Sequence, residues 1–251
     1  MRTKFVNFRD MGGLETPYGK LKSGKLFRTG ALYPKCKADE EYIASMHLDA
    51  VVDFRTPNEV ADKPDAVPKG AEYIHAMVFE VDAPGISTTS GTIKDVFKMS
   101  EQDVATARAF VEKTYSFMAY SKEYDKLFAL MDEGKTIDFH CTAGKDRTGI
   151  AAMLIELSFG RTFDECKAEY LASNDYRARE NKKVSTLLKL MGVKRHVREF
   201  VDEVLRTHER LFEIAKRSIL DKYASADEFL EKEHGITAER RAKWIETYIQ
   251  A

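Results

Sequence analysis

The stretch His140-Cys141-Thr142-Ala143-Gly144-Lys145-Asp146-Arg147-Thr148-Gly149 decides the fold of this chain. A short apolar run typical of a strand precedes it, and an almost wholly apolar run with helical character, residues 150–157, follows it. The pattern predicts a strand, a tight loop and the start of a buried helix. A helix start offers unpaired backbone N–H groups and the positive end of the helix dipole, so the stretch predicts a phosphate-binding loop.

Two side chains give this loop its chemistry. Cys141 lies at the base of the loop, where the field that attracts phosphate also lowers the pKa of a thiol and favours the thiolate nucleophile. Arg147 follows six positions later and has the planar guanidinium that binds two phosphate oxygens at once. The predicted phosphate-binding residues are Thr142, Ala143, Gly144, Lys145, Asp146 and Arg147.

The motif His-Cys-x5-Arg-Thr resembles the signature of cysteine-dependent protein tyrosine phosphatases. Together with three upstream blocks it is similar to the bacterial atypical tyrosine phosphatases, a family that also includes enzymes acting on phosphoinositides. The blocks are residues 7–13 (NFRDMGG), 26–32 (LFRTGAL) and 52–60 (VDFRTPNEV). The resemblance implies hydrolysis of phosphotyrosine, with phosphoserine and phosphothreonine as further substrates, through a cysteinyl-phosphate intermediate.

Short apolar or alternating runs predict strands at residues 25–28, 50–54, 72–79 and 135–139. Helical patterns separate most of them, which predicts an α/β fold, and the resemblance implies that this fold is of the protein tyrosine phosphatase type. Its central twisted sheet is largely parallel and has helices on both faces. The last third, from about Arg177, is predicted to be helical throughout. Thr56, Thr162 and Ser225 each precede a Glu by three residues, a pattern typical of helix starts.

We expect one phosphatase domain over residues 1–251, with a possible lid or insertion at about 80–120. Residues 80–100 contain Pro, Gly and a Ser/Thr cluster without a clear period, and they follow a strand that points toward the loop. A solvated connection without a function is the alternative interpretation of this segment. The length of 251 residues suits a single core.

The overall composition limits the classes of binding partner and the compartment that we expect for this chain. With 40 Lys plus Arg against 41 Asp plus Glu, the net charge of −1 gives no general preference for nucleic acid or membrane, and we expect neither nucleic-acid binding nor stable membrane insertion. Three cysteines without a close pair fit a reducing compartment. No apolar run of signal-peptide length follows Met1, so we expect a cytoplasmic protein, with secretion left open. Partners are then a phosphorylated protein or phosphoinositide substrate, and phosphate as product.

Two aspartates compete to protonate the leaving oxygen of the substrate. Asp146 lies in the loop itself, and in the atypical family the Asp of Lys-Asp-Arg is proposed to serve as the general acid. Asp82 is the rival, because ordinary tyrosine phosphatases supply this acid from a loop upstream of the cysteine. The resemblance favours Asp146 as the third catalytic residue, beside Cys141 and Arg147.

Several further residues are expected to support the loop. By strand alternation His140 points away from the loop, so we assign it to hydrogen bonding, while Thr148 is expected to donate its hydroxyl to the thiolate. Asp53 and Arg55 fall at a strand end and are expected to belong to buried Arg–Asp pairs that buttress the loop. Arg9, Asp10 and Arg28 share this structural interpretation.

Other uses of the loop stay open at this stage. Lys145 adds a cation at the rim, which suits either a polyanionic phosphoinositide or inositol phosphate head group or an ion pair with Asp146. A phosphate-binding module without catalysis has no need of the nucleophile, and sulfur transfer or arsenate reduction usually needs a different loop or partner cysteines. The six histidines show no spacing typical of metal ligands, so we expect neither a metal nor another cofactor.

Overall fold

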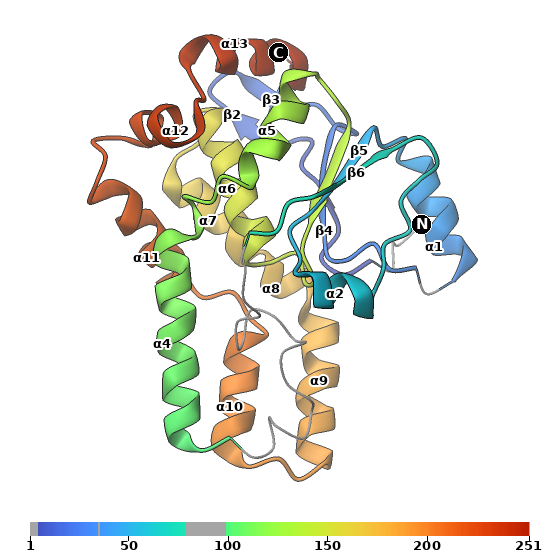
Figure 1. Cartoon of the computed structure of the whole chain (residues 1–251), viewed down its shortest axis with the longest axis vertical. Helices are drawn as coiled ribbons and strands as arrows, with labels where there is room; N and C mark the ends of the chain where they lie inside the picture. Colours follow the sequence, from blue (N-terminus) through green and yellow to red (C-terminus); the bar gives the residue numbers. More distant parts are fainter. Residues whose placement is uncertain (1–4, 35, 79–98, 251) are drawn as a thin grey trace.

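The computed structural model of the chain describes residues 5–34, 36–78 and 99–250. Its centre is a five-stranded sheet with the order β1-β4-β7-β5-β6 (Figure 1). All neighbouring strands run parallel except the edge pair β1–β4, which confirms the largely parallel sheet. The strands are β1 (Arg9–Asp10), β4 (Leu26–Thr29), β5 (Ala50–Asp53), β6 (Glu72–His75) and β7 (Ile137–His140).

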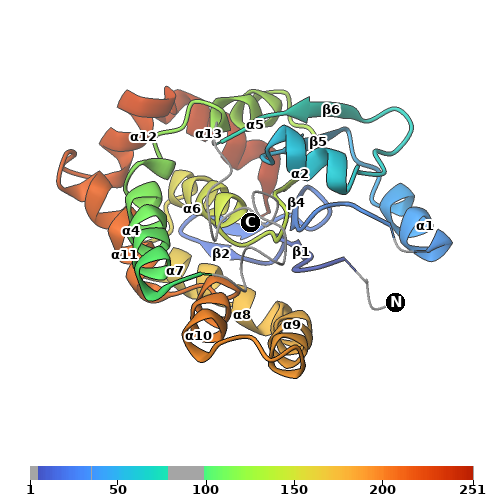
Figure 2. The same cartoon turned by 60° about the horizontal axis from the view of Figure 1, so that its bottom comes forward.

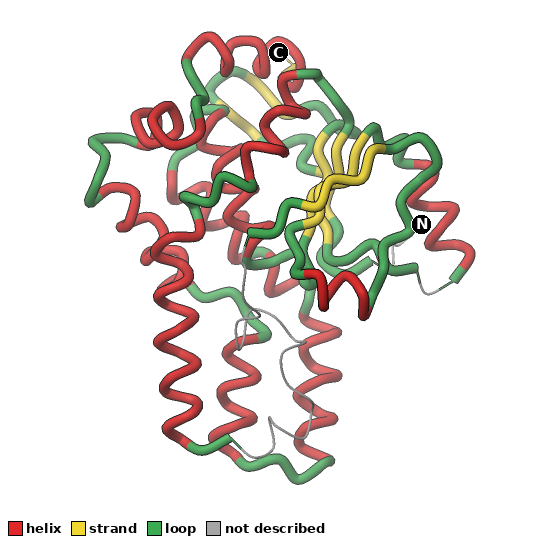
Figure 3. The backbone as a smooth tube through the Cα atoms, in the orientation of Figure 1, coloured by secondary structure: helices red, strands yellow, loops and turns green. Residues whose placement is uncertain are grey.

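Helices cover both faces of this sheet, as Figure 3 shows by element type. One face packs against a large core with α4 to α6, and the other against a smaller core with α1. The N-terminal helices are α1 (Lys37–Ser45), α2 (Pro57–Asp62), α4 (Glu101–Met118), α5 (Tyr124–Asp132), α6 (Arg147–Ser158), α7 (Phe163–Leu171) and α8 (Ser173–Tyr176). The C-terminal helices are α9 (Ala178–Leu190), α10 (Arg195–Val204), α11 (Glu209–Leu220), α12 (Ala226–His234) and α13 (Ala238–Tyr248).

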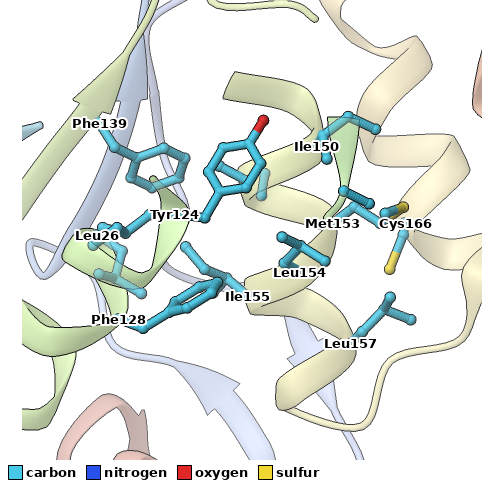
Figure 4. Close-up of a cluster of buried hydrophobic side chains, with 14 of the residues drawn as sticks. Leu26, Tyr124, Phe128, Phe139, Ile150, Met153, Leu154, Ile155, Leu157 and Cys166 are labelled. Carbon is cyan, nitrogen blue, oxygen red and sulfur yellow. The ribbon is translucent and has the colours of Figure 1, made fainter. Parts of the chain in front are cut away.

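The helix that follows the loop is the most deeply enclosed helix of the described chain. Every residue of α6 is buried, which confirms the prediction from its apolar sequence. Figure 4 shows Ile150, Leu154 and Ile155 of α6 among Phe139 of β7 and Tyr124 of α5. A helix fixed on all sides holds its first turn, and therefore the loop, in one position.

The predicted helix starts are also present. Thr56 and Thr162 both accept from the backbone N–H three residues later and form complete capping boxes with Glu59 and Glu165. Ser225 accepts from the Glu228 amide at the start of α12. These local signals were reliable because each one needs residues only three positions apart.

A second, smaller sheet was not predicted. It has the order β2-β3-β8, from Glu15–Thr16, Gly19–Leu21 and Ile249–Gln250, and it joins the two ends of the described chain. The prediction of helix throughout the last third is therefore wrong for residues 249–250. Strands of two or three residues carry no usable periodicity, and β8 pairs with β3, which lies more than 200 residues earlier in the chain.

The helices α4, α9 and α10 extend from the sheet as a separate layer (Figures 1 and 2). Within the proposed lid, residues 101–118 form α4, which packs against α10 through Val104, Ala107 and Phe200. Of the other lid residues, 80–98 lie outside the described part of the chain. Among the described helices, none is both long enough and apolar enough to cross a bilayer.

Candidate active site

The loop of residues 141–146 connects the end of β7 to the start of α6, at the carboxyl edge of the sheet. Gly144 makes its tight path possible. Its φ is +66°, and a Cβ atom there would stand 2.3 Å from the carbonyl oxygen of Thr29. A side chain is therefore excluded on both conformational and steric grounds. The loop reaches the surface at Thr142 and Ala143, which are partly exposed.

Three side chains hold the carbonyl groups of the loop. Asn7 donates to the Gly144 oxygen at 2.7 Å and Arg28 to the same oxygen at 3.0 Å. Arg177 donates to the Ala143 oxygen at 3.2 Å. By contrast, the amide N–H groups of residues 142–146 donate to no acceptor in the part of the chain that the structure describes. Fixed carbonyls and free amides at a helix N-terminus suit a bound anion.

Cys141 lies at the bottom of this loop and is buried, with 1% of its surface exposed. Burial alone would raise the pKa of its thiol, but the guanidinium of Arg147 and the Thr148 hydroxyl outweigh burial and lower it. The Thr148 hydroxyl has no other partner among the described residues. The thiolate predicted from the sequence is thus supported by two specific neighbours.

The guanidinium of Arg147 is held by Glu59, a residue that the sequence did not assign to the site. Two hydrogen bonds of 2.7 and 2.8 Å join its Nη1 and Nη2 to the two carboxylate oxygens of Glu59, and Nη1 also donates to the Phe54 carbonyl at 3.2 Å. The Thr142 hydroxyl donates to the same carboxylate. Glu59 therefore fixes the arginine from one side and the loop from the other.

A sequence signal for Glu59 existed but indicated a different role. Its position three residues after Thr56 predicted a helix cap, and Glu59 Oε2 does accept from the Thr56 amide at 2.9 Å. Burial raises the pKa of Glu59, yet hydrogen bonding and charge attraction from Arg147 outweigh it and keep the carboxylate ionised. One side chain serves both the cap and the loop.

Asp146 is surrounded by partners that hold its carboxyl group. The Lys145 ammonium lies 2.6 Å from one of its oxygens and 2.9 Å from the other, and the Tyr115 hydroxyl donates to it. Tyr115 also shares a 2.8 Å hydrogen bond with Tyr170. Lys145 is 6% exposed, so of its two interpretations the structure shows the ion pair with Asp146. Neither tyrosine was predicted to belong to the site.

A small pocket adjoins this end of the loop. Lys145 and Asp146 line it together with Arg108 of α4, Phe200 of α10 and Arg206 from the turn before α11. The rival acid, Asp82, lies outside the described residues. Among the described residues, Asp146 is thus the candidate that stands beside both the loop and a pocket.

Beneath the loop lies a buried polar cluster. Arg55 donates to Asp53 and Asp65 at 2.8 and 2.6 Å, and His140 Nε2 stands 3.2 Å from Asp65. Burial alone would lower the pKa of His140, but Asp65 and Asp53 raise it to about 10. The raised pKa favours the protonated form of His140, whose ring faces Asp53 and Asp65 below the loop.

The expected Arg–Asp pairing is wrong for the residues of β1 and β4. Arg9 instead binds Glu169 at 2.6 Å, and Arg28 lies 3.7 Å from the same carboxylate. Asp10 accepts from the amides of Gly12 and Gly24, so it shapes a turn. Glu169 could not be recognised in advance, because it lies on α7, 160 residues from Arg9.

Asp53, Asp65 and His140 also have donor atoms of the kind that hold metals, all within 4.8 Å of one another. Arg55, however, lies between the two carboxylates and donates to both. A histidine binds a metal through its neutral imidazole, whereas the raised pKa of His140 favours the protonated ring. The donor set therefore fits an ion-pair network better than a metal site.

Comparison with known proteins identifies related chains. A model of the tyrosine phosphatase family matches residues 2–250. A Cupriavidus necator protein provisionally named a tyrosine-protein phosphatase is 30% identical over 229 residues, which cover 89% of this chain and 80% of that protein. The triple specificity protein phosphatase PtpB of Mycobacterium tuberculosis is 28% identical over 188 residues, covering 67% of each chain.

Proposed function

The chain belongs to the tyrosine phosphatase family, and from this premise we propose that it hydrolyses phosphotyrosine in proteins through a cysteinyl-phosphate intermediate. Phosphoserine and phosphothreonine are further substrates of the same chemistry. The observation that carries the proposal is the loop itself. Its amides donate to no described residue, the pKa of its thiol is lowered, and its arginine is held in place by Glu59.

In the first step the Cys141 thiolate attacks phosphorus. A sulfur–phosphorus bond forms while the bond from phosphorus to the tyrosine oxygen breaks, and the bonding electrons leave with that oxygen. The loop amides and Arg147 stabilise the charge on the three remaining phosphoryl oxygens. Asp146, which adjoins the loop, gives a proton to the leaving oxygen.

In the second step a water molecule attacks the phosphorus of the intermediate. Its proton passes to the Asp146 carboxylate, the sulfur–phosphorus bond breaks, and phosphate and the thiolate are released. The contacts from Lys145 and Tyr115 keep the Asp146 carboxyl group in one position for both steps. The cycle returns every group to its starting state.

A direct test uses an aryl phosphate and a matched pair of cysteine variants. Cys141→Ser should lower kcat by about 10⁴-fold or more. Cys166→Ser is the control, because this thiol lies on α7, where burial raises its pKa. Acid quenching followed by mass spectrometry should find one phosphoryl group on Cys141. Unchanged activity of Cys141→Ser would overturn the proposal.

The acid is tested by Asp146→Asn and Asp82→Asn under the same conditions. With a good leaving group, which needs no proton, the Asp146→Asn enzyme should accumulate the intermediate because its second step lacks a base. Asp82→Asn should remain close to the wild type. The reverse result would transfer the acid role to Asp82 and leave the nucleophile unchanged.

The alternative of phosphoinositide or inositol phosphate hydrolysis relied on Lys145 as a free cation at the rim. In the structure this ammonium is buried and paired with Asp146. Phosphotyrosine therefore remains the proposed substrate. The term triple specificity in the name of the Mycobacterium tuberculosis relative belongs to that protein.

A further inference from the structure

Charge is distributed unevenly along the chain. The whole chain has a net charge of −1, yet residues 177–195, from the residue before α9 to the first residue of α10, contain seven Lys or Arg and one Glu. Lys182, Lys189 and Lys194 are exposed and have no ion-pair partner among the described residues. Such a cluster concentrates positive potential on one helix.

The same helix exposes apolar side chains between these cations. Leu190 is 80% exposed and Leu187 is 52% exposed, while Val184 and Met191 are also exposed. Lys183, Leu187 and Leu190 follow the helical spacing of a single stripe. Leucines exposed to this degree and grouped on one face indicate a surface that is covered in some functional state.

The opposite face of α9 packs against α10 and the turn that connects the two helices. Leu188 is buried in a small cluster with Val193 and Val197, and Asn181 donates to the Leu205 carbonyl at 3.0 Å. Figure 2 shows α9 at the outer edge of the molecule, beside α10. Lys183, Leu187 and Leu190 therefore lie on the side of α9 that faces away from α10.

We propose that the outward face of α9 docks on an anionic lipid surface. This face, here called the α9 face, is defined by Arg179, Lys182, Lys183, Leu187 and Leu190. Lysine and arginine attract anionic head groups, and the leucines enter the boundary between head groups and acyl chains. A nucleic acid would pair with the lysines and arginine but would leave the leucines exposed to water. Cations and leucines on one face therefore favour a lipid surface as the partner.

Docking would also position the phosphatase loop. Arg177, directly before α9, donates to the Ala143 carbonyl of the loop. The face therefore begins beside the active site, and a helix of 13 residues extends about 20 Å from it. The proposed substrates of this surface-bound enzyme are then phosphotyrosine residues of proteins held close to a membrane.

Vesicle sedimentation with the full chain tests the proposal. The protein should sediment with vesicles of phosphatidylserine and phosphatidylcholine and stay in solution with phosphatidylcholine alone. Each cation near an anionic surface contributes about 1 kcal/mol, so K182Q/K183Q should lower partitioning by about 30-fold. L187S/L190S should lower it by about tenfold or more, and high salt should weaken binding of the wild type.

Two matched controls keep the test specific. K232Q/K243Q removes the same charge from exposed positions of α12 and α13, and Leu220→Ser removes an exposed leucine of α11. Both should bind vesicles like the wild type. All variants should retain turnover of a soluble aryl phosphate, which shows that they are folded. Equal losses in the controls, binding to a DNA duplex in place of vesicles, or Leu190-dependent dimers without vesicle binding would each overturn the proposal.

Discussion

At the scale of single residues, the position of Arg147 depends on Glu59. The Glu59 carboxylate accepts hydrogen bonds from both terminal nitrogens of the guanidinium, so the arginine is oriented before a substrate binds. Such a partner is absent from the ten-residue motif because it lies 88 positions earlier in the chain. The motif predicted the phosphate clamp, whereas only the fold shows what holds it.

Glu59→Gln should therefore reduce catalysis more than stability. Glutamine still accepts from the Thr56 amide in a capping box, but it cannot pair with the charge of Arg147. We expect kcat/KM to fall by about 10- to 100-fold, as for other partners that orient an active-site group, with a small shift of the unfolding midpoint. Glu72→Gln, at an exposed ion pair with Lys135, is the control. Wild-type turnover by Glu59→Gln would mean that Arg147 needs no such support.

At the scale of elements, strand β7 places two ionisable groups on one buried face. Asp138 and His140 share that face with Asp53 and Asp65, while Ile137 and Phe139 enter the large core. Burial raises the pKa of Asp138 to about 7, although His140 and Thr29 act to lower it. The folded protein therefore retains a proton that the unfolded chain releases near pH 4.

This proton predicts a pH dependence of stability. The pKa of Asp138 is higher in the folded state, so protonation of Asp138 stabilises the folded state. This contribution to the free energy of unfolding is fully present below about pH 4 and is lost as pH rises through 7. The free energy of unfolding should fall by about 2 kcal/mol between pH 5 and pH 7 through this group. Asp138→Asn, which can still accept from Thr29, should flatten that fall in urea titrations, and Asp221→Asn at an exposed position should not. Parallel pH curves for Asp138→Asn and the wild type would contradict the assignment.

At the scale of the whole molecule, sequence reasoning succeeded where information is local and failed where it is distant. The loop, the buried helix and the helix caps depend on residues within a few positions, and all three were predicted. Tyr115, Asp65 and Glu169 reach the site or its support only through folding, and no spacing in the sequence relates them to it. The small sheet that joins both ends of the described chain was not predicted for the same reason.

That sheet gives a prediction for global stability. Gly19 of β3 has a φ of +126°, and a Cβ atom there would stand 2.4 Å from the carbonyl oxygen of Gln250 in β8. Gly13 has a φ of +85° with no atom near an added Cβ, so Gly13→Ala carries conformational strain alone. Gly19→Ala should therefore lower the free energy of unfolding by about 1 to 2 kcal/mol more than Gly13→Ala in urea titrations. Turnover per folded molecule should stay unchanged, because α6 and its loop are fixed by the large core. Equal losses in the two variants would show that pairing between β3 and β8 adds nothing to the stability of the whole chain.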